Sequence, residues 1–339
     1  MFTPHTLGLA LFMMITSAIC WGSWANTYKG VKNYRFELFY WDYAIGIFLI
    51  ALILGHTMGS TSHDASSLIR NVHSANPSDV ILAMVGGAIF NLANLLLVAA
   101  IDMAGLAIAF PVSIGIALVV GVITSYAQNP QGNAGLLAAG VLCALIAVVL
   151  DGRAYRSLAA ARSSTEGSTS SSTSKKSIIV CVVSGVLMGL WAPFMTRAMP
   201  HEVNGVIQGS LGPYAAAIFL TLGALLSCLL WNVYFMKHPL VGQPVKFSGY
   251  FSASASGHAL GLLGGFIWGI GMVFNLVAAS FTGVAISYAI GQSAPMVAAL
   301  WGVLAWKEFD GAPGKAKMYL GLMFVFYCLG ILLVARANG

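Results

Sequence analysis

Long apolar runs separated by short polar stretches make up most of this 339-residue chain. The hydrocarbon core of a bilayer, about 30 Å thick, is crossed by about 20 helical residues. The runs are continuously apolar, whereas barrel strands alternate apolar and polar residues over shorter segments. The pattern therefore predicts ten transmembrane helices, over residues 7–27, 36–56, 80–101, 105–127, 134–151, 178–198, 211–236, 258–280, 283–304 and 318–336.

A stretch rich in serine and threonine separates the fifth apolar run from the sixth. Residues 163–177 consist only of serine, threonine, glutamate, glycine and lysine, so this stretch contains no large apolar side chain. Such a composition cannot build a core and is typical of a flexible linker. We therefore predict a first five-helix unit over residues 1–151, a linker over 152–177 and a second five-helix unit over 178–339.

Small and aromatic residues at matching positions relate the two units. The matches pair Ser17, Gly22, Trp24 and Ala25 with Ser184, Gly189, Trp191 and Ala192, and, at a constant offset, Gly86, Gly87 and Gly105 with Gly264, Gly265 and Gly283. Because each unit has an odd number of spans, the two units insert with opposite topology. The sequence thus predicts an all-α membrane protein of two inverted five-helix repeats, an arrangement typical of transporters.

Composition excludes an ordinary soluble domain. Charged residues make up 8% of the chain and hydrophobic residues 58%, with a mean hydropathy of +0.85. Soluble domains carry about 25% charged residues, so lipid must surround these helices. The net charge of +6 is scattered over the loops without a basic stripe, which disfavours nucleic acid as a partner and fits loops that face anionic lipid.

The distribution of lysine and arginine predicts the orientation in the membrane. Most of the 16 basic residues lie in the loops after odd-numbered spans. Cytoplasmic loops carry the excess of basic residues. We therefore expect a multi-pass protein of the cell (inner) membrane, with both termini extracytoplasmic and the linker cytoplasmic.

Asp42 is the one carboxylate that lies clearly within a predicted span, in the sequence Phe39-Tyr40-Trp41-Asp42-Tyr43. Ionisable residues at such depth are costly and often functional. Asp42 is therefore the candidate proton-coupling residue. The alternative is a structural aspartate, bonded to tyrosine hydroxyls or paired with Lys29 or Lys32. We expect Asp102, Asp151 and Glu308 to sit at hydrated span ends, with Glu308 balanced by Lys307.

Uncharged polar side chains recur at mid-depth in spans three, eight and nine. Asn91 and Asn94 lie one turn apart and so share a helix face; the others are Asn275, Ser287, Tyr288 and Gln292. Amide and hydroxyl groups offer donors and acceptors without charge, which suits a small neutral substrate. The alternative role is hydrogen bonding between helices.

Two tryptophans at equivalent repeat positions, Trp24 and Trp191, extend this candidate substrate site. Their rings, like those of Trp21, Trp268 and Tyr288, can stack on a planar heterocycle or a sugar, although aromatic belts at the membrane interface are a common alternative. Pro111, Pro193 and Pro295 are expected to interrupt spans four, six and nine, either as breaks or as simple kinks. Broken helices near a binding site free backbone groups to face the cavity.

Enzyme and channel functions are disfavoured. Aspartyl proteolysis within the membrane needs two facing carboxylates, a serine enzyme needs a base beside its nucleophile, and His56 and His258 lie near span ends. The five cysteines are odd in number, lie in apolar runs and lack metal-site spacing. We expect no catalytic residue, no metal and no cofactor. The sequence contains no repeated filter motif and no ring of charged residues, and this disfavours a channel.

Several motifs, in order along the chain, resemble the ten-helix drug/metabolite transporter (DMT) superfamily. They are Asp42-Tyr43, Gly86-Gly87-x3-Asn91-Leu92-x-Asn94, Ala104-Gly105-Leu106, Gly264-Gly265-Phe266, Leu300-Trp301-Gly302-Val303-Leu304 and Lys307-Glu308-Phe309. Within that superfamily the chain looks most like the ureide permease family, with the bacterial glucose/ribose porters next.

This resemblance implies a secondary permease, proton-coupled, for a small neutral polar solute such as a ureide, a nucleobase or a sugar. It also leaves open an exporter of drugs or metabolites, because many members of the superfamily face that way. The expected partners are the substrate, protons and membrane lipid, with the protein a monomer or a homodimer.

Overall fold

Helices dominate the computed structural model, which describes all residues except 33, 62–66, 167–174, 204 and 338–339. Within the described residues, ten segments are long and apolar enough to cross a membrane. Together the elements are α1 (Leu7–Ser23), α2 (Asn26–Lys29), α3 (Phe36–Thr57), α4 (Leu68–Ser74), α5 (Pro77–Ala104), α6 (Leu106–Gln128), α7 (Ala134–Glu166), α8 (Lys175–Ala198), β1 (His201–Val203), β2 (Val206–Gln208), α9 (Pro213–Ser227), α10 (Trp231–Lys237), α11 (Ser248–Phe251), α12 (Ala255–Thr282), α13 (Val284–Gly291), α14 (Ala294–Leu304) and α15 (Gly314–Arg336).

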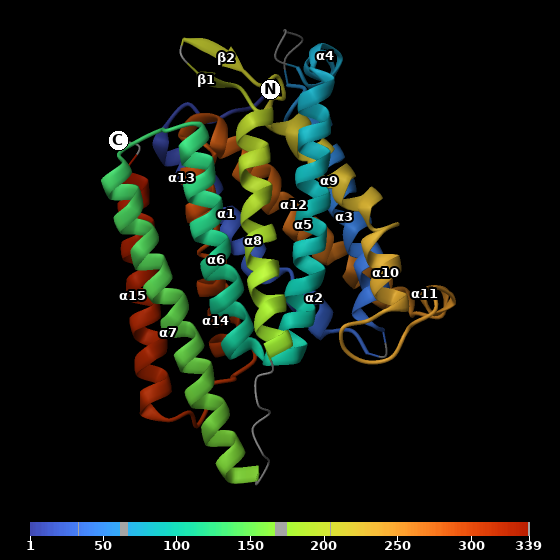
Figure 1. The fold of residues 1–339 in the computed structure, drawn as a ribbon, viewed down its shortest axis with the longest axis vertical. Coiled ribbons are helices and arrows are strands. Elements are labelled where there is room, and N and C mark those ends of the chain that lie inside the picture. The colour runs from blue at the N-terminus through green and yellow to red at the C-terminus, as the bar shows by residue number, and fades with distance from the viewer. Residues whose placement is uncertain (33, 62–66, 167–174, 204, 338–339) are drawn as a thin grey trace.

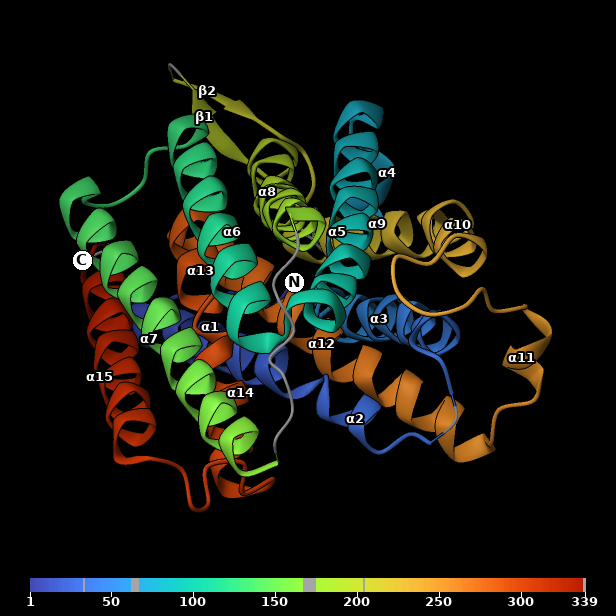
Figure 2. The ribbon, with the colours of Figure 1, turned by 60° about the horizontal axis from the view of Figure 1, so that its bottom comes forward.

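The long helices run side by side as a bundle, with both termini at one end (Figure 1). We call this the terminal end, and the opposite end, where α7 ends and α8 begins, the linker end. The antiparallel hairpin β1–β2 and α4 lie at the terminal end, while α2 and α11 lie toward the linker end. In the bundle, α5 packs against α8 and α9, α12 against α1 and α3, and α7 against α15 (Figure 2).

Local sequence signals start and stop the long helices. The Thr6 hydroxyl accepts a hydrogen bond from the Leu9 amide and caps α1, and Ser254 caps α12 in the same way. Pro77 occupies the first turn of α5, where its missing N–H costs nothing. Gly105 and Gly283 end α5 and α12 with φ of 76° and 81°, a conformation that glycine adopts without strain.

The ten predicted spans are confirmed, and three of them consist of two helices: span one (α1 and α2), span seven (α9 and α10) and span nine (α13 and α14). Span nine is broken at Gln292–Ser293, between α13 and α14, and Pro295 follows in the first turn of α14. This break agrees with the prediction, because proline removes a helical hydrogen bond. Span seven is broken between α9 and α10, which the sequence did not predict. Pro111 and Pro193 instead lie inside continuous helices, so breaks at these two positions are wrong and the alternative without a break stays open.

The predicted linker over 152–177 is largely helical in the structure. Helix α7 continues to Glu166 and α8 begins at Lys175, so only 167–174 separates them, and this stretch lies outside the described residues. The extension of α7 follows from its composition, because alanine, leucine and arginine after Asp151 favour a helix in water as well as in lipid. The short elements α4, α11 and β1–β2 were not predicted.

Glycines let two helix pairs approach to backbone contact. A Cβ atom on Gly87 of α5 would collide with the Leu220 carbonyl of α9, and one on Gly223 of α9 with Met84 of α5. The pair α3–α12 has the same arrangement, with Gly46 against Leu262 and Gly265 against Tyr43. Small residues at helix contacts are the principal means of close packing in lipid.

We expect Gly87→Ala to destabilise the protein, because the added methyl group has no space between α5 and α9. Overpacking of this kind costs about 1–3 kcal/mol. The measurement is the thermal unfolding midpoint of the purified protein in detergent. Gly321→Ala on α15 is the matched control, since open space surrounds Gly321. Equal midpoints for the two variants would contradict the close contact.

Candidate functional site

A cavity of about 330 Å³ lies in the middle of the bundle, lined by side chains from helices of both halves of the chain. We call it the central cavity. It reaches Lys29 and Asp102, which are exposed at the linker end, and extends inward to Trp191 and Gln292, which are buried. Its volume lies at the lower end of the range for small-molecule sites, about 300–1,000 Å³.

Aromatic rings form the inner wall of the central cavity. Trp268 of α12 stacks on Phe90 and on Trp21, with ring centroids 4.4 and 5.8 Å apart. Trp191 meets Trp21 edge-on at 6.2 Å. Trp24 also lines the cavity and packs against Tyr43. Rings held in this way present flat, rigid surfaces on which a planar solute can stack.

Two uncharged amides, Asn94 and Gln292, are the inner polar groups of this wall. The Asn94 Nδ2 atom donates to the Tyr40 hydroxyl at 3.2 Å. Gln292 sits at the break between α13 and α14 and is 8% exposed. In the described part of the chain its side-chain amide makes no hydrogen bond, so both its donor and its acceptor are available to a bound solute.

Four of the residues predicted from the sequence as substrate-binding thus line the cavity: Trp24, Asn94, Trp191 and Gln292. The structure brings them together from α1, α5, α8 and the α13–α14 break. Trp21 and Trp268, two further rings that the sequence marked as able to stack on a solute, also line the cavity. Sequence reasoning did not select Phe90, because a phenylalanine on an apolar helix is common in membranes.

The other four residues bond helices to one another and do not line the cavity. Asn91 donates to the Ser227 hydroxyl at 2.7 Å, beside the break in span seven. Asn275 and Ser287 exchange hydrogen bonds between α12 and α13, each side chain reaching the other residue's carbonyl at 3.0 and 2.6 Å. The Tyr288 hydroxyl lies 3.2 Å from two carbonyls, on α6 and α8. For these residues the structure agrees with the alternative role, hydrogen bonding between helices.

Asp42 lies outside the cavity, in a buried polar cluster near the linker end. Its Oδ1 accepts from the Tyr250 hydroxyl at 2.6 Å, and its Oδ2 from the Tyr34 hydroxyl at 2.8 Å. His258 Nδ1 is also 2.8 Å from Oδ2. Burial, and then the hydrogen bond to Asp42, raise the pKa of Tyr34 and Tyr250, so both phenols stay protonated and donate.

His258 was missed by sequence reasoning because it lies near a span end and far from Asp42 in the chain. The alternative predicted for Asp42, hydrogen bonding to tyrosine hydroxyls, matches the geometry. The other alternative, an ion pair with Lys29, is wrong. Lys29 Nζ instead contacts Glu308 Oε1 at 2.9 Å. Among the described residues, Lys32 also makes no ion pair with Asp42.

Glu308 and Asp151 differ from the expectation of hydrated span ends. Glu308 pairs with Lys29 rather than Lys307, and its Oε2 accepts from the Tyr155 hydroxyl at 3.3 Å. Asp151 is 4% exposed, because α7 continues beyond it and packs against α15. Asp102, as expected, is exposed.

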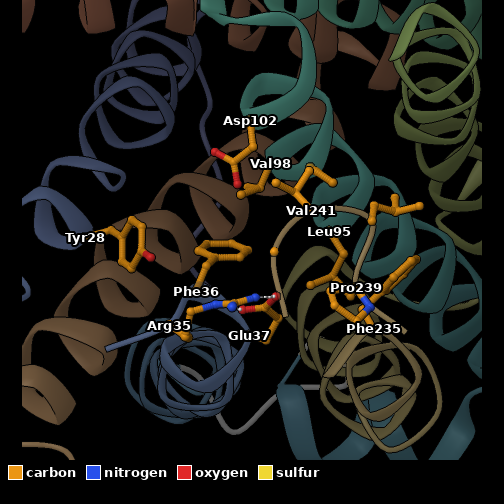
Figure 3. Close-up of a pocket in the computed structure, with 13 residues that line it drawn as sticks. Tyr28, Arg35, Phe36, Glu37, Leu95, Val98, Asp102, Phe235, Pro239 and Val241 are labelled. Carbon is orange, nitrogen blue, oxygen red and sulfur yellow. Dashed lines mark hydrogen bonds and ion pairs between the residues drawn. The ribbon is translucent and has the colours of Figure 1, made fainter. Parts of the chain in front are cut away.

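A second pocket, of about 270 Å³, adjoins the central cavity at the linker end (Figure 3). We call it the side pocket. It lies between the start of α3, the end of α5 and the segment 235–242, and Arg35, Glu37 and Asp102 are its charged residues. Among the described residues, no group of three His, Cys, Asp or Glu side chains lies close enough to hold a metal ion.

A bundle of membrane-length helices around a solute-sized cavity, open at one end, defines a multi-pass membrane transport protein. The sequence model of the ureide permease family matches residues 39–179 and 168–336. The chain therefore belongs to the ureide permease family.

Curated relatives match the chain from end to end at low identity. Ureide permease 2 and Ureide permease 1 of Arabidopsis thaliana are 24% and 22% identical, each over 100% of this chain and 99% of the relative. Probable ureide permease A3 of Vigna unguiculata is 22% identical, over 68% of this chain and 77% of that protein.

A protein of known crystal structure has a similar fold, with a TM-score of 0.53 and 18% identity over 96% of this chain and 98% of that chain. At this identity the similarity concerns the fold alone.

We expect Tyr288→Phe to lower the thermal unfolding midpoint and to leave solute binding within about twofold. The hydroxyl bonds two helices, and a lost buried hydrogen bond costs about 0.5–1.5 kcal/mol. Binding is followed by tryptophan fluorescence, since Trp21 and Trp191 line the cavity. Tyr234→Phe, on an exposed ring, is the control. Lost binding at an unchanged midpoint would place Tyr288 in the substrate site.

Proposed function

We propose that the protein is a secondary active transporter that carries a small, neutral, planar ureide through the central cavity. The observation that carries this proposal is the pairing of stacked aromatic walls with two uncharged amides, one of them unbonded. The names of the curated relatives point to the same substrate class.

The chemistry of a ureide complements this wall. A ureido group presents N–H donors beside a carbonyl acceptor, and the primary amide of Gln292 presents the matching acceptor and donor. The ring of a cyclic ureide, or of a nucleobase, can lie flat against Trp268 or Trp21. A hexose can stack on the same rings, but it lacks N–H donors beside a carbonyl. This difference places a hexose below both a ureide and a nucleobase.

Alternating access is supported by the way the cavity is closed. The cavity reaches exposed residues at the linker end, whereas toward the terminal end it stops at Trp191, which packs against the buried Tyr288 ring at 5.3 Å. Transport would then require Trp191 and Tyr288 to separate while the linker end closes. The break between α13 and α14 is a natural hinge for that movement.

Two inverted repeats, residues 1–151 and 178–339 around the linker 152–177, remain our architectural proposal. The glycine contacts support it, because α5 meets α9 as α12 meets α3. The turns at Gly105 and Gly283 support it too, since both have nearly the same φ and ψ. The wider relation to the DMT superfamily and the bacterial glucose/ribose porters is a proposal of the same kind.

The orientation proposed from the basic loops puts the linker end in the cytoplasm and both termini outside the cell (inner) membrane. In that orientation the central cavity faces the cytoplasm. We propose no oligomeric state beyond the monomer or homodimer expected from the sequence.

Proton coupling at Asp42 is supported by the geometry of its cluster. As a carboxylate, Asp42 accepts from Tyr34, Tyr250 and His258 at once. These contacts occupy three of the about four lone-pair sites of the carboxylate, so a proton can bind at the remaining site or along the contact with His258, which would weaken that contact. His258 is 26% exposed and Asp42 only 3%, which makes His258 the group through which a proton reaches Asp42 from the linker end.

The cluster is joined to the cavity by the helices that carry it. Helix α3 carries Asp42 and also Tyr40, which holds Asn94 in place. Helix α12 carries His258 and also Trp268 of the aromatic wall. Protonation that loosens the contact between Asp42 and His258 would therefore act on both walls of the substrate site.

The substrate proposal is tested by titrating purified protein with allantoin, uracil and glucose while following tryptophan fluorescence. We expect the tightest binding for allantoin and the weakest for glucose. Gln292→Ala should weaken allantoin about 3- to 10-fold, as expected for one neutral hydrogen bond. Gln208→Ala, on the exposed hairpin, is the control. Equal binding of glucose and allantoin, or no effect of Gln292→Ala, would refute this substrate assignment.

Asp42→Asn is expected to abolish proton-driven accumulation in proteoliposomes and to leave counterflow exchange largely intact. The amide keeps the shape of the carboxyl group but cannot bind and release a proton. Asp310→Asn, a change to an exposed carboxylate in the loop before α15, should leave both activities unchanged. Normal accumulation by the Asp42 variant would remove the coupling role.

A further inference from the structure

The side pocket is a second cavity whose lining differs from that of the central cavity. Four residues line both spaces: Tyr28, Phe36, Val98 and Asp102. A solute that leaves one space therefore meets the same side chains as it enters the other. The central cavity is aromatic and uncharged in its depth, whereas the side pocket carries three charged side chains.

A paired arginine and glutamate form one wall of the side pocket. Arg35 donates to both oxygens of Glu37, at 3.1 and 2.5 Å, and to the Gln243 carbonyl at 3.0 Å. Glu37 holds the pKa of the Arg35 guanidinium above its ordinary value, so this group stays charged. These contacts use three of the five guanidinium N–H donors. Arg35 therefore keeps donors for a ligand in the pocket.

Asp102 lies across the pocket from this pair (Figure 3). Among the described residues, its carboxylate makes no hydrogen bond and no ion pair within 4 Å. Figure 3 shows the rings of Tyr28 and Phe36 on the wall between Asp102 and Arg35. The pocket thus offers an unpaired acceptor at one side, unused donors at the other and aromatic rings beside them.

We propose that the side pocket is a second, entry site for the transported ureide. A carboxylate can accept two parallel N–H bonds from one ureido group, as it does from a guanidinium fork. With its N–H groups on Asp102, the solute can turn a carbonyl oxygen toward Arg35. An anion is disfavoured because Asp102 and Glu37 outnumber Arg35, and the pocket suits a solute with N–H donors on one edge and a carbonyl acceptor on the opposite edge.

This inference rests on the proposed function, since it assigns the same ureide to a second place. Substrate arriving at the linker end binds the side pocket first and passes Tyr28 and Phe36 into the central cavity. The entry site raises the local concentration of ureide at the mouth and disfavours anions before they reach the aromatic wall. Its loss would slow capture without weakening the inner site.

Two variants test the entry site. Asp102→Asn removes the charged acceptor that lies where the two spaces meet, and Ala99→Phe fills the side pocket from a position that does not line the central cavity, so it separates the two sites. Counterflow exchange of allantoin in proteoliposomes passes substrate through the linker end in every cycle, whichever way the protein inserts. Tryptophan fluorescence reports the central cavity alone, because no tryptophan lines the side pocket.

We expect both variants to lower kcat/KM for exchange, Asp102→Asn about tenfold, the value of one charged hydrogen bond, while the Kd of Ala99→Phe from fluorescence stays within twofold of the parent. Asp310→Asn should change neither quantity. Unchanged kcat/KM in both variants would overturn the entry site. A weaker affinity of Ala99→Phe, seen as a Kd that rises in parallel with the fall in kcat/KM, would overturn it too. If allantoin neither quenches the tryptophan fluorescence of the parent protein nor is exchanged by it in proteoliposomes, the proposed function itself fails.

Discussion

Inside a bilayer every backbone N–H and C=O must find its partner within the protein, because lipid tails supply none. The spans satisfy this constraint by remaining helical, and even Pro111 and Pro193 are absorbed without a break. The backbone departs from a helix in span nine at Gln292, where the chain lines the central cavity. Span one is likewise irregular at Trp24 and Ala25, which also line the cavity, whereas the break in span seven between α9 and α10 lies away from it. Two of the three breaks thus lie where the backbone faces a cavity.

Close packing and polar bonding leave the cavity its shape. Glycines bring α5 against α9 and α12 against α3, which fixes the helices that carry Phe90 and Trp268. Buried polar groups such as Asn275 and Ser287 are used to join helices, since an unpaired polar group in hydrocarbon is costly. The cavity is therefore lined by a flat aromatic surface with few polar atoms. Because polar groups are few there, the side-chain amide of Gln292, which makes no hydrogen bond among the described residues, is a main polar group available to a solute.

Charges are gathered near the linker end, away from the inner wall. Lys29 pairs with Glu308, Arg35 with Glu37, and Asp42 lies in contact with His258. Water at that end reduces the cost of ionised groups, which is far higher at mid-depth. The separation allows proton binding and substrate binding to occur in different places, connected by α3 and α12.

The sequence by itself determined the class of protein, because span length and hydropathy depend only on local composition and on the thickness of the bilayer. It also identified Asp42, since a carboxylate in an apolar run stands out without any knowledge of its neighbours. Only the tertiary structure decided which polar residues face the cavity. Asn91 and Asn94 lie one turn apart on α5, yet the first bonds to α9 and the second lines the cavity. That outcome depends on which helices pack beside α5. His258 shows the same limit, because its distance from Asp42 along the chain is closed only by the packing of α12 on α3.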